Sequence, residues 1–329
     1  MNILNQLDLR EEIVEENEII KPTSNNNFIE ANTLKVNLEH LKNDCIIPVF
    51  SKDNETTISH YQFIEKTYEI VKNLFPDFTP SQPDIRVSHI IKGRTPSAIG
   101  KPAKELLEEE KTLYYERCAF VIELHQAKEY INGNTLTLSI GGVRAYNQEN
   151  LYSKKSIEKF KIFIGYQNKV CTNLCISTDG FKNDIRITSV NELEDAVTNL
   201  AKGYNRFSHL NMMKKMSSYS INETQFAHLI GKIKMYQYLD KSKQKEIFPF
   251  GLNDGQINSV IRDYFNCTNF SKDSNGNINL WNLYNLFTEA SKSSYIDNAI
   301  ERNINSYEFT NYLCKMIENE SSDWYNLFV

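Results

Sequence analysis

The sequence predicts an α+β protein with a strand-rich N-terminal half, built on antiparallel hairpins, and a helical C-terminal half. Between residues 33 and 188, short apolar runs are separated by turn-forming residues, which is typical of strands. Between residues 189 and 329, apolar residues recur every three or four positions after helix-capping residues, which is typical of amphipathic helices. An acidic stretch followed by loop-forming residues precedes both regions, so we expect residues 1–32 to be a mobile tail.

The strand-rich half contains two predicted hairpins. Strand-like runs at 114–124 and 135–146 flank Asn132-Gly133-Asn134, a strong hairpin signal. A second pair, 160–166 and 170–177, flanks a short polar turn. We also expect a strand over 84–94.

Two helices are predicted within this same half. One follows the capping box that begins at Ser59, and the other covers the Leu- and Glu-rich segment 101–110.

Five amphipathic helices are predicted in the C-terminal half. Capping boxes begin at Ser189, Ser220 and Asn253, and Asn279 is a further cap. The helix after Asn253 carries the apolar stripe Ile257, Val260, Ile261, Tyr264 and Phe265, and the last stripe runs over 309–317.

Charge is distributed unevenly along the chain. Residues 1–20 hold six carboxylates against Arg10, so this tail alone accounts for the formal net charge of -5 and the remainder sums to zero. A neutral body neither favours nor excludes an anionic partner.

The chain start has no basic region followed by an apolar run of signal length, and no segment reaches membrane-spanning length. We therefore expect a cytoplasmic protein with no membrane partner, whose six scattered cysteines are free thiols.

Two apparent metal motifs are better explained as structure. Residues 271–282 resemble a calcium loop, but Ser271 and Asn282 replace the first carboxylate and the bidentate Glu. Cys171 and Cys175 share one face of a predicted strand, yet no second Cys or His pair lies nearby. Neither a nucleotide-binding nor a hydrolase motif is present, so we expect no metal and no cofactor.

A basic segment is the strongest functional signal. Between Ile85 and Lys104 the chain carries Arg86 and the four candidate residues Lys92, Arg94, Lys101 and Lys104, without a carboxylate. Irregular basic backbone commonly binds phosphate, whereas lysines also blunt exposed strand edges. Arg144, after Gly141-Gly142, and Lys169, in the polar turn 168–173, are expected near the rim of the same sheet.

Several segments resemble a bacterial domain-of-unknown-function family, numbered 3871. They are 91–98, 101–107, 114–120, 141–147, 168–175, 229–239 and 277–288, and the resemblance extends from about residue 35 to 315. It implies a single family unit of Bacteroidetes-type genomes, often on mobile elements, with no established activity. Residues 170–173 and 280–285 are also similar to the phage- and plasmid-associated family 932.

These observations favour an accessory protein of a phage or mobile element that engages nucleic acid, single-stranded or within a complex. The nucleic-acid partner would be bound by Lys92, Arg94, Lys101, Lys104, Arg144 and Lys169. Abundant aromatic residues could add base stacking. The alternative is a protein-interaction or structural module that binds a protein partner through its acidic tail. An enzyme is the third hypothesis, with Arg94, Tyr115, Glu116, Arg117 and Arg144 as the polar residues of interest.

Overall fold

The computed structural model describes residues 27–47, 57–149, 158–187, 189–320 and 323–327. It is an α+β structure whose central antiparallel sheet has the order β1-β2-β5-β6-β7-β8, with β9 also paired to β7. The strands of this sheet are β1 Leu34–Val36, β2 Asp84–Val87, β5 Arg117–Ile131, β6 Asn134–Ala145, β7 Glu158–Asn168, β8 Leu174–Cys175 and β9 Phe181–Ile187.

The β5–β6 hairpin confirms the turn predicted from sequence. Ile131 pairs with Asn134, and the two residues between them, Asn132 and Gly133, have φ angles of 47° and 78°. Asparagine and glycine tolerate this left-handed conformation better than other residues, which is why they form tight hairpin turns. The β7–β8 pairing predicted beyond it is also present.

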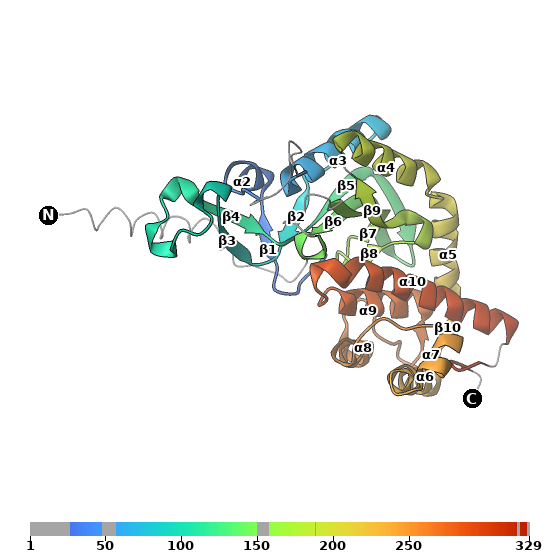
Figure 1. Cartoon of the computed structure of the whole chain (residues 1–329). Helices are drawn as coiled ribbons and strands as arrows, with labels where there is room; N and C mark the ends of the chain where they lie inside the picture. The colour runs from blue at the N-terminus through green and yellow to red at the C-terminus, as the bar shows by residue number, and fades with distance from the viewer. Residues whose placement is uncertain (1–26, 48–56, 150–157, 188, 321–322, 328–329) are drawn as a thin grey trace.

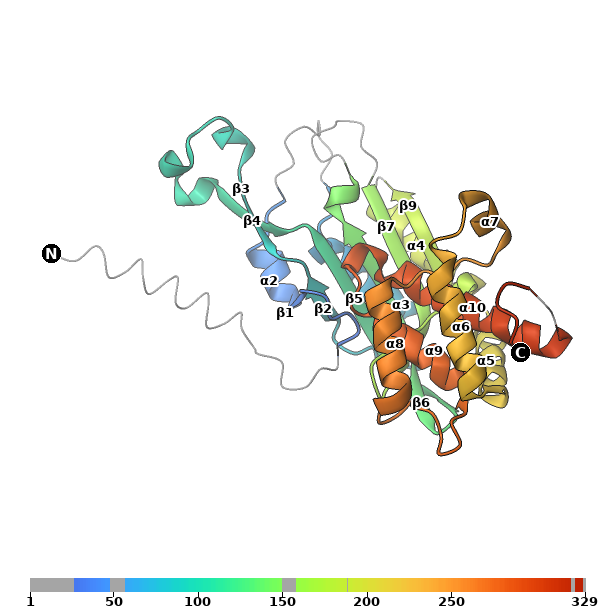
Figure 2. The same cartoon turned by 90° about the horizontal axis from the view of Figure 1, so that it is seen from below.

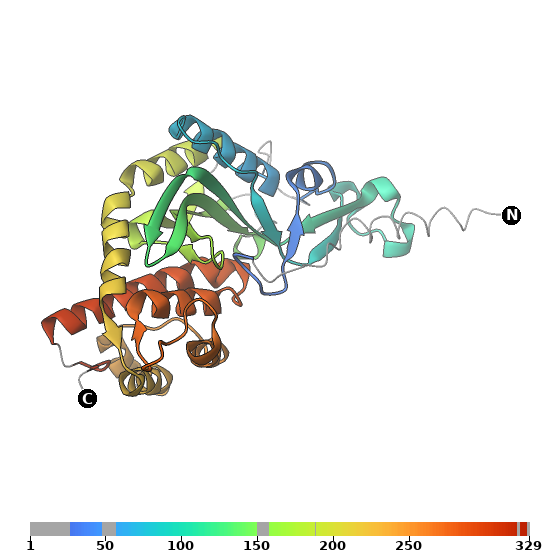
Figure 3. The ribbon, with the colours of Figure 1, turned by 180° about the vertical axis from the view of Figure 1, so that it is seen from behind.

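Helices cover both faces of the curled sheet (Figure 1). Helices α3 and α4 lie on one side of the sheet, and α9 and α10 lie on the other (Figure 3). Helices α6, α7 and α8 lie beyond α9 and α10, farther from the sheet. The helices are α2 Leu38–Asn43, α3 His60–Leu74, α4 Val190–Gly203, α5 Arg206–Ser218, α6 Glu223–Tyr236, α7 Lys241–Glu246, α8 Asp254–Asn266, α9 Leu280–Ser291 and α10 Ile296–Asn319.

The largest hydrophobic cluster extends through both halves of the chain, from Leu41 to Leu327. Its members come from the sheet and from the helices on either side of it, so the two regions predicted from sequence share one interior. None of the helices in the described residues is both long enough and apolar enough to span a membrane.

Capping chemistry starts the helices as predicted in most cases. Ser59, Asn253 and Asn279 each accept a hydrogen bond from the backbone three residues on. The exception is the helix expected after Ser220. Ser220 pairs with Asn279 in the short strand β10 (Ser220–Ile221), and Asn222 caps α6 instead.

A projecting arm replaces two elements expected from sequence. The expected strand 84–94 divides into β2 and β3 (Ile90–Arg94), and β3 pairs with β4 (Lys111–Tyr115) outside the central sheet. The helix expected over 101–110 is wrong, because this segment forms two short 3-10 turns at the tip of the arm. Pro102 starts one of these turns, and no long apolar face is buried there to stabilise a full helix.

Two burial expectations also need correction. Phe265, expected on the buried stripe of α8, is half exposed, and Ile261 is partly buried. Phe28 and Ile29, assigned to the mobile tail, are buried in a second hydrophobic cluster with Ile296 and Ile300 of α10. The tail boundary predicted at residue 32 is therefore too late, and residues 1–26 lie outside the described residues.

Candidate nucleic-acid interface

Arg144 lies inside the molecule, which corrects the expectation that it meets a partner at the sheet rim. Its side chain is fully buried between two rings, with the guanidinium carbon 4.7 Å from the centre of Tyr146 and 4.3 Å from that of Phe160. It forms ion pairs with Glu149 at 3.2 Å and with Glu158 at 2.9 Å. These internal partners occupy the guanidinium, so it has no role at the surface.

The glycine pair before Arg144 serves packing. A Cβ atom at Gly142 would lie 2.4 Å from the ring of Phe63 on α3, and one at Gly141 would lie 2.1 Å from the carbonyl oxygen of Phe120. The close approach of α3 at Gly142 and of the neighbouring strand β5 at Gly141 explains the two glycines without a ligand.

His60 adds a titratable group to the Arg144 cluster. Its ring stacks on Tyr146 at 4.3 Å, and its Nε2 lies 2.9 Å from the carbonyl oxygen of Tyr115. Burial, together with the nearby charge of Arg144, lowers the pKa of His60 to about 3. His60 is therefore neutral at physiological pH.

The polar turn 168–173 fixes the sheet to α9 and to Lys292, the residue after this helix. Asn168 and Asn173 are buried and bond to Asn285 of α9, at 3.1 Å and 3.0 Å. Lys292 donates to the carbonyl oxygen of Cys171. Burial raises the pKa of the Cys171 thiol to about 12, so it stays protonated. Cys118, Cys171, Cys175, Cys267 and Cys314 are free thiols.

Lys169 is the exposed cation of that turn, and it lies apart from the arm. Its ammonium pairs with Glu123 at 2.7 Å. Glu123 lies on β5, and the arm joins the sheet near Arg117, six residues before Glu123 on the same strand. Six residues of extended strand correspond to roughly 20 Å. The structure therefore does not combine Lys169 with the arm cations in one site.

The four arm cations are only partly available. Arg94 donates to the carbonyl oxygen of Lys101, and Lys101 forms an ion pair with Glu110. Lys92 and Lys104 are exposed and have no ion pair among the residues that the structure describes. Two free cations next to a run of glutamates make a weak phosphate site.

A groove lies beside α7. Figure 2 shows α7 at the end of the molecule opposite the arm. The groove has a volume of about 350 Å³, within the usual size range of ligand pockets. Its walls come from the end of α7, the segment after it, α10 and the C-terminal segment: Lys245, Glu246, Ile247, Phe248, Tyr312, Asp323 and Trp324.

The aromatic walls of this groove are held in place. Phe248 stacks on Tyr312 with ring centres 4.8 Å apart. Trp324 donates its indole N–H to the carbonyl oxygen of Lys232 at 3.2 Å, and the Lys232 ammonium lies 4.5 Å from the ring centre. The buried Tyr325 next to Trp324 donates to the carbonyl oxygen of Phe248 at 3.2 Å. These contacts preorganise the rings for a flat ligand.

One lysine of α7, Lys245, lines the groove, and two more lie on the same short helix. Lys241, Lys243 and Lys245 are exposed on α7, and none has an ion pair in the described part of the chain. Gln244 fixes this short helix to the end of α6, because its side chain donates to the carbonyl oxygen of Tyr236 at 3.0 Å. Flexible ammonium groups therefore project from a fixed backbone.

Comparison with known proteins confirms the family resemblance. The profile of a domain of unknown function numbered 3871, described as a B. Theta gene description, matches residues 9–328. The chain belongs to this family. No curated protein and no solved structure matches it.

The polar residues considered for an enzyme are engaged within the family 3871 protein. Tyr115 is buried, with its hydroxyl 2.9 Å from Nε2 of His40. Arg117 pairs with Glu116 at 2.7 Å and approaches Asp297 of α10 at 3.5 Å. These contacts anchor the base of the arm and the start of α10.

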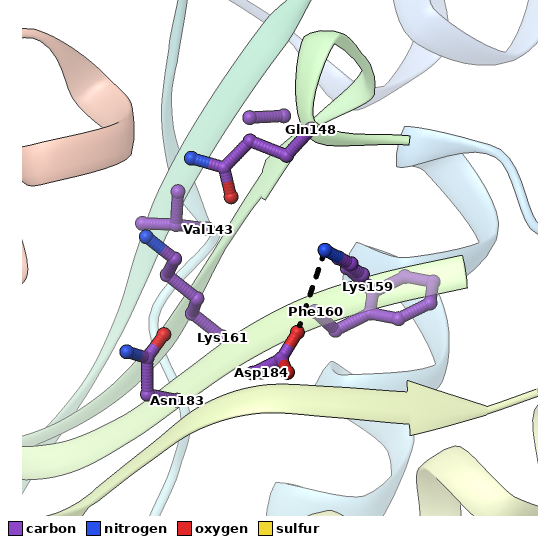
Figure 4. Close-up of a pocket in the computed structure, with 8 residues that line it drawn as sticks. Val143, Gln148, Lys159, Phe160, Lys161, Asn183 and Asp184 are labelled. Carbon is purple, nitrogen blue, oxygen red and sulfur yellow. Dashed lines mark ion pairs between the residues drawn. The ribbon is translucent and has the colours of Figure 1, made fainter. Parts of the chain in front are cut away.

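A much smaller cavity lies beside Phe160 (Figure 4). Its volume is about 20 Å³, enough for a single water. Lys161, which lines it, is bonded to the carboxylate of Glu301, and Lys159 lies 3.9 Å from Asp184. No group of three or more metal-ligating side chains occurs among the described residues.

Sequence reasoning missed the α7 groove. The segment 241–248 alternates lysines with polar residues and then turns apolar, which is a readable signal for a basic, aromatic surface. The signal was incomplete, because Tyr312 and Trp324 come from distant positions and join Phe248 only in the folded protein.

Proposed function

We propose that this protein binds single-stranded nucleic acid at the α7 groove, without catalysis. The proposal rests on one observation: among the described residues, three aromatic side chains and Lys245 line one groove, and Lys245 belongs to a short helix that carries two further lysines without ion pairs. Proteins that bind single strands combine aromatic stacking surfaces with cations that follow the phosphate backbone. An accessory role in a phage or mobile element, which the sequence resemblance implies, belongs to the same proposal.

Tyr312 and Trp324 would stack a base. Both side chains are partly exposed at the groove, and their inner sides are held by Phe248 and Lys232. Stacking on an aromatic side chain contributes about 1–3 kcal/mol per base.

The α7 lysines would contact the phosphates that flank this base. Lys241 and Lys245 are four residues apart and therefore lie on the same side of α7, and Lys245 lines the groove itself. Each ammonium that replaces a counterion makes binding more sensitive to salt.

Two carboxylates determine which part of a nucleotide can enter the groove. Glu246 and Asp323 also line the groove and would repel a phosphate that entered it. They can instead accept hydrogen bonds from base amino groups. This arrangement favours a base inside and phosphates at the rim, which requires an unpaired base and hence a single strand.

Binding without catalysis is supported by the position of the perturbed histidines. Burial lowers the pKa of His60 and of His209 to about 3, and both lie in the enclosed core. Neither lines the groove. A perturbed titratable group at a pocket is a mark of a catalytic site, and these two do not provide it.

Fluorescence anisotropy with labelled single strands tests the proposal. Replacing Lys241, Lys243 and Lys245 with Gln should weaken binding and lower the log–log salt slope by about 0.7 per lost contact. The comparison is made at about 50 mM and about 200 mM salt. Replacing the exposed Lys72 of α3, Lys182 of β9 and Lys202 of α4 with Gln makes the same charge change outside the groove and should have little effect.

A second variant separates stacking from charge. Tyr312→Leu keeps an apolar side chain but removes the ring, and it should weaken binding with an unchanged salt slope. An absence of binding to any single strand at low salt would overturn the proposal. So would an equal loss in the α7 triple variant and its control.

A further inference from the structure

The β3–β4 arm is a second surface with no role in nucleic-acid binding at the groove. It projects away from the body at the end opposite α7 (Figures 1 and 2). Its strands form a separate two-stranded sheet, and Ile46 contacts its base by donating a backbone hydrogen bond to Leu113 at 2.9 Å.

The tip of the arm is ordered by its own contacts. Lys101 pairs with Glu110, and the Glu110 carboxylate also accepts a hydrogen bond from the backbone of Leu107 at 3.0 Å. Ala98 is fully buried within the tip. A structured tip held away from the body is preorganised for contact with another molecule.

Two large apolar side chains remain uncovered on this tip. Ile99 is 61% exposed and Leu107 is 55% exposed. Exposed apolar residues on a projecting, ordered element are typical of a protein contact, whereas phosphate contact needs neither of them.

The exposed charges left over on the arm are balanced, while the half-buried Arg94 donates to the carbonyl oxygen of Lys101. The ion pairs Lys101–Glu110 and Lys111–Glu108 neutralise four groups. Among the described residues, the exposed charges without an ion pair are two cations and two anions: Lys92, Lys104, Glu105 and Glu109. These four exposed charges sum to zero, so they offer a phosphate backbone little net attraction.

A second copy of this arm carries two glutamates that can pair with the two lysines of the first copy, and two lysines that can pair with its glutamates. In a two-fold symmetric contact each surface meets itself, so the lysines of one copy can face the glutamates of the other. We propose that the arms of two copies of this chain associate, with Ile99 and Leu107 at the centre and these four charges around them.

Sedimentation over a micromolar to millimolar concentration series tests the association. The wild-type chain should self-associate reversibly, and Ile99→Asp with Leu107→Asp should weaken association by about tenfold or more. Tyr130→Asp changes an equally exposed apolar residue on β5, outside the arm, and should leave association unchanged. An unchanged melting temperature for both variants would show that folding is intact.

A charge swap identifies the partner as a second copy. One variant carries Lys92→Glu and Lys104→Glu, and the other carries Glu105→Lys and Glu109→Lys. Each should self-associate poorly, and mixing them should restore association because unlike charges then face each other. A wild-type chain that stays monomeric throughout, or swapped variants that associate no better when mixed, would overturn the proposal. A monomer that binds a different protein through its arm would also overturn it.

Discussion

Arg144 and Lys245 of α7 both lie beside aromatic residues, but among the described residues Arg144 has carboxylate partners and the α7 lysines do not. Glu149 and Glu158 enclose the Arg144 guanidinium inside the sheet. The α7 lysines have no such partner in the described residues, and their ammonium groups face solvent. A cation beside aromatic residues is therefore a binding candidate only when its own chain leaves it unpaired.

The largest expected difference between the two regions is in stability. Arg144→Met should lower the free energy of unfolding by about 3–5 kcal/mol, because it leaves two buried carboxylates without their partner. Lys245→Met should change it by less than about 0.5 kcal/mol, because the side chain is exposed. Urea denaturation measures both. Similar values for the two variants would remove the distinction.

The pH dependence of stability sharpens the same comparison. His60 has a folded-state pKa of about 3, below its ordinary value, so the unfolded chain binds the proton first as pH falls. Stability from this group is complete above about pH 6.5 and is lost as pH falls toward 3. Between pH 6.5 and 5 the loss from His60 alone should reach about 2 kcal/mol, and His209, with its pKa also lowered to about 3, should add a similar amount to the profile that urea denaturation measures at each pH.

A matched pair of variants assigns this loss. His60→Asn should flatten the pH profile over that interval, leaving the share of His209, whose pKa burial also lowers to about 3. The α7 triple variant should keep the wild-type profile. A His60→Asn profile as steep as that of the wild type would contradict the buried, neutral histidine.

A preference for one base over another tests whether the two carboxylates of the groove contact the bases. Carboxylates accept hydrogen bonds from the amino group of cytosine, which thymine lacks. We expect oligo(dC) to bind more tightly than oligo(dT), on the order of tenfold. In Asp323→Asn with Glu246→Gln the preference should shrink, as measured by anisotropy. Equal binding of both oligomers to the wild type would exclude base contact by these two residues.

The smallest expected effect concerns calcium. Asp273 accepts backbone hydrogen bonds from Asn275 at 2.9 Å and Asn277 at 2.8 Å, and the bond from Asn277 contributes most to lowering its pKa. Like Arg144, this charge is satisfied by its own chain. Neither calcium nor a chelator should move the melting temperature, and a calcium-dependent rise would show a metal site in this loop.

Local features of the fold could be predicted because they depend on neighbours in sequence. Asn132-Gly133 makes a tight turn wherever it joins two strands, and Asn253 caps a helix through Gln256 three residues away. The helix expected over 101–110 failed for the opposite reason. The sequence contained good helix formers, but whether they had a surface to pack against depended on the path of the whole arm.

By itself, the sequence determined the fold class, the family, and the alternation of strands and helices, since all of these follow from residue periodicity, capping and motif similarity. Tertiary structure alone decided which cations are free. Arg144 and Lys101 have carboxylate partners on their own chain, while Lys241 and Lys245 have none within the described residues. The physical reason is that charge availability and a shared groove depend on distances between side chains far apart in sequence. Phe248, Tyr312 and Trp324 become neighbours only when α10 packs against the segment after α7.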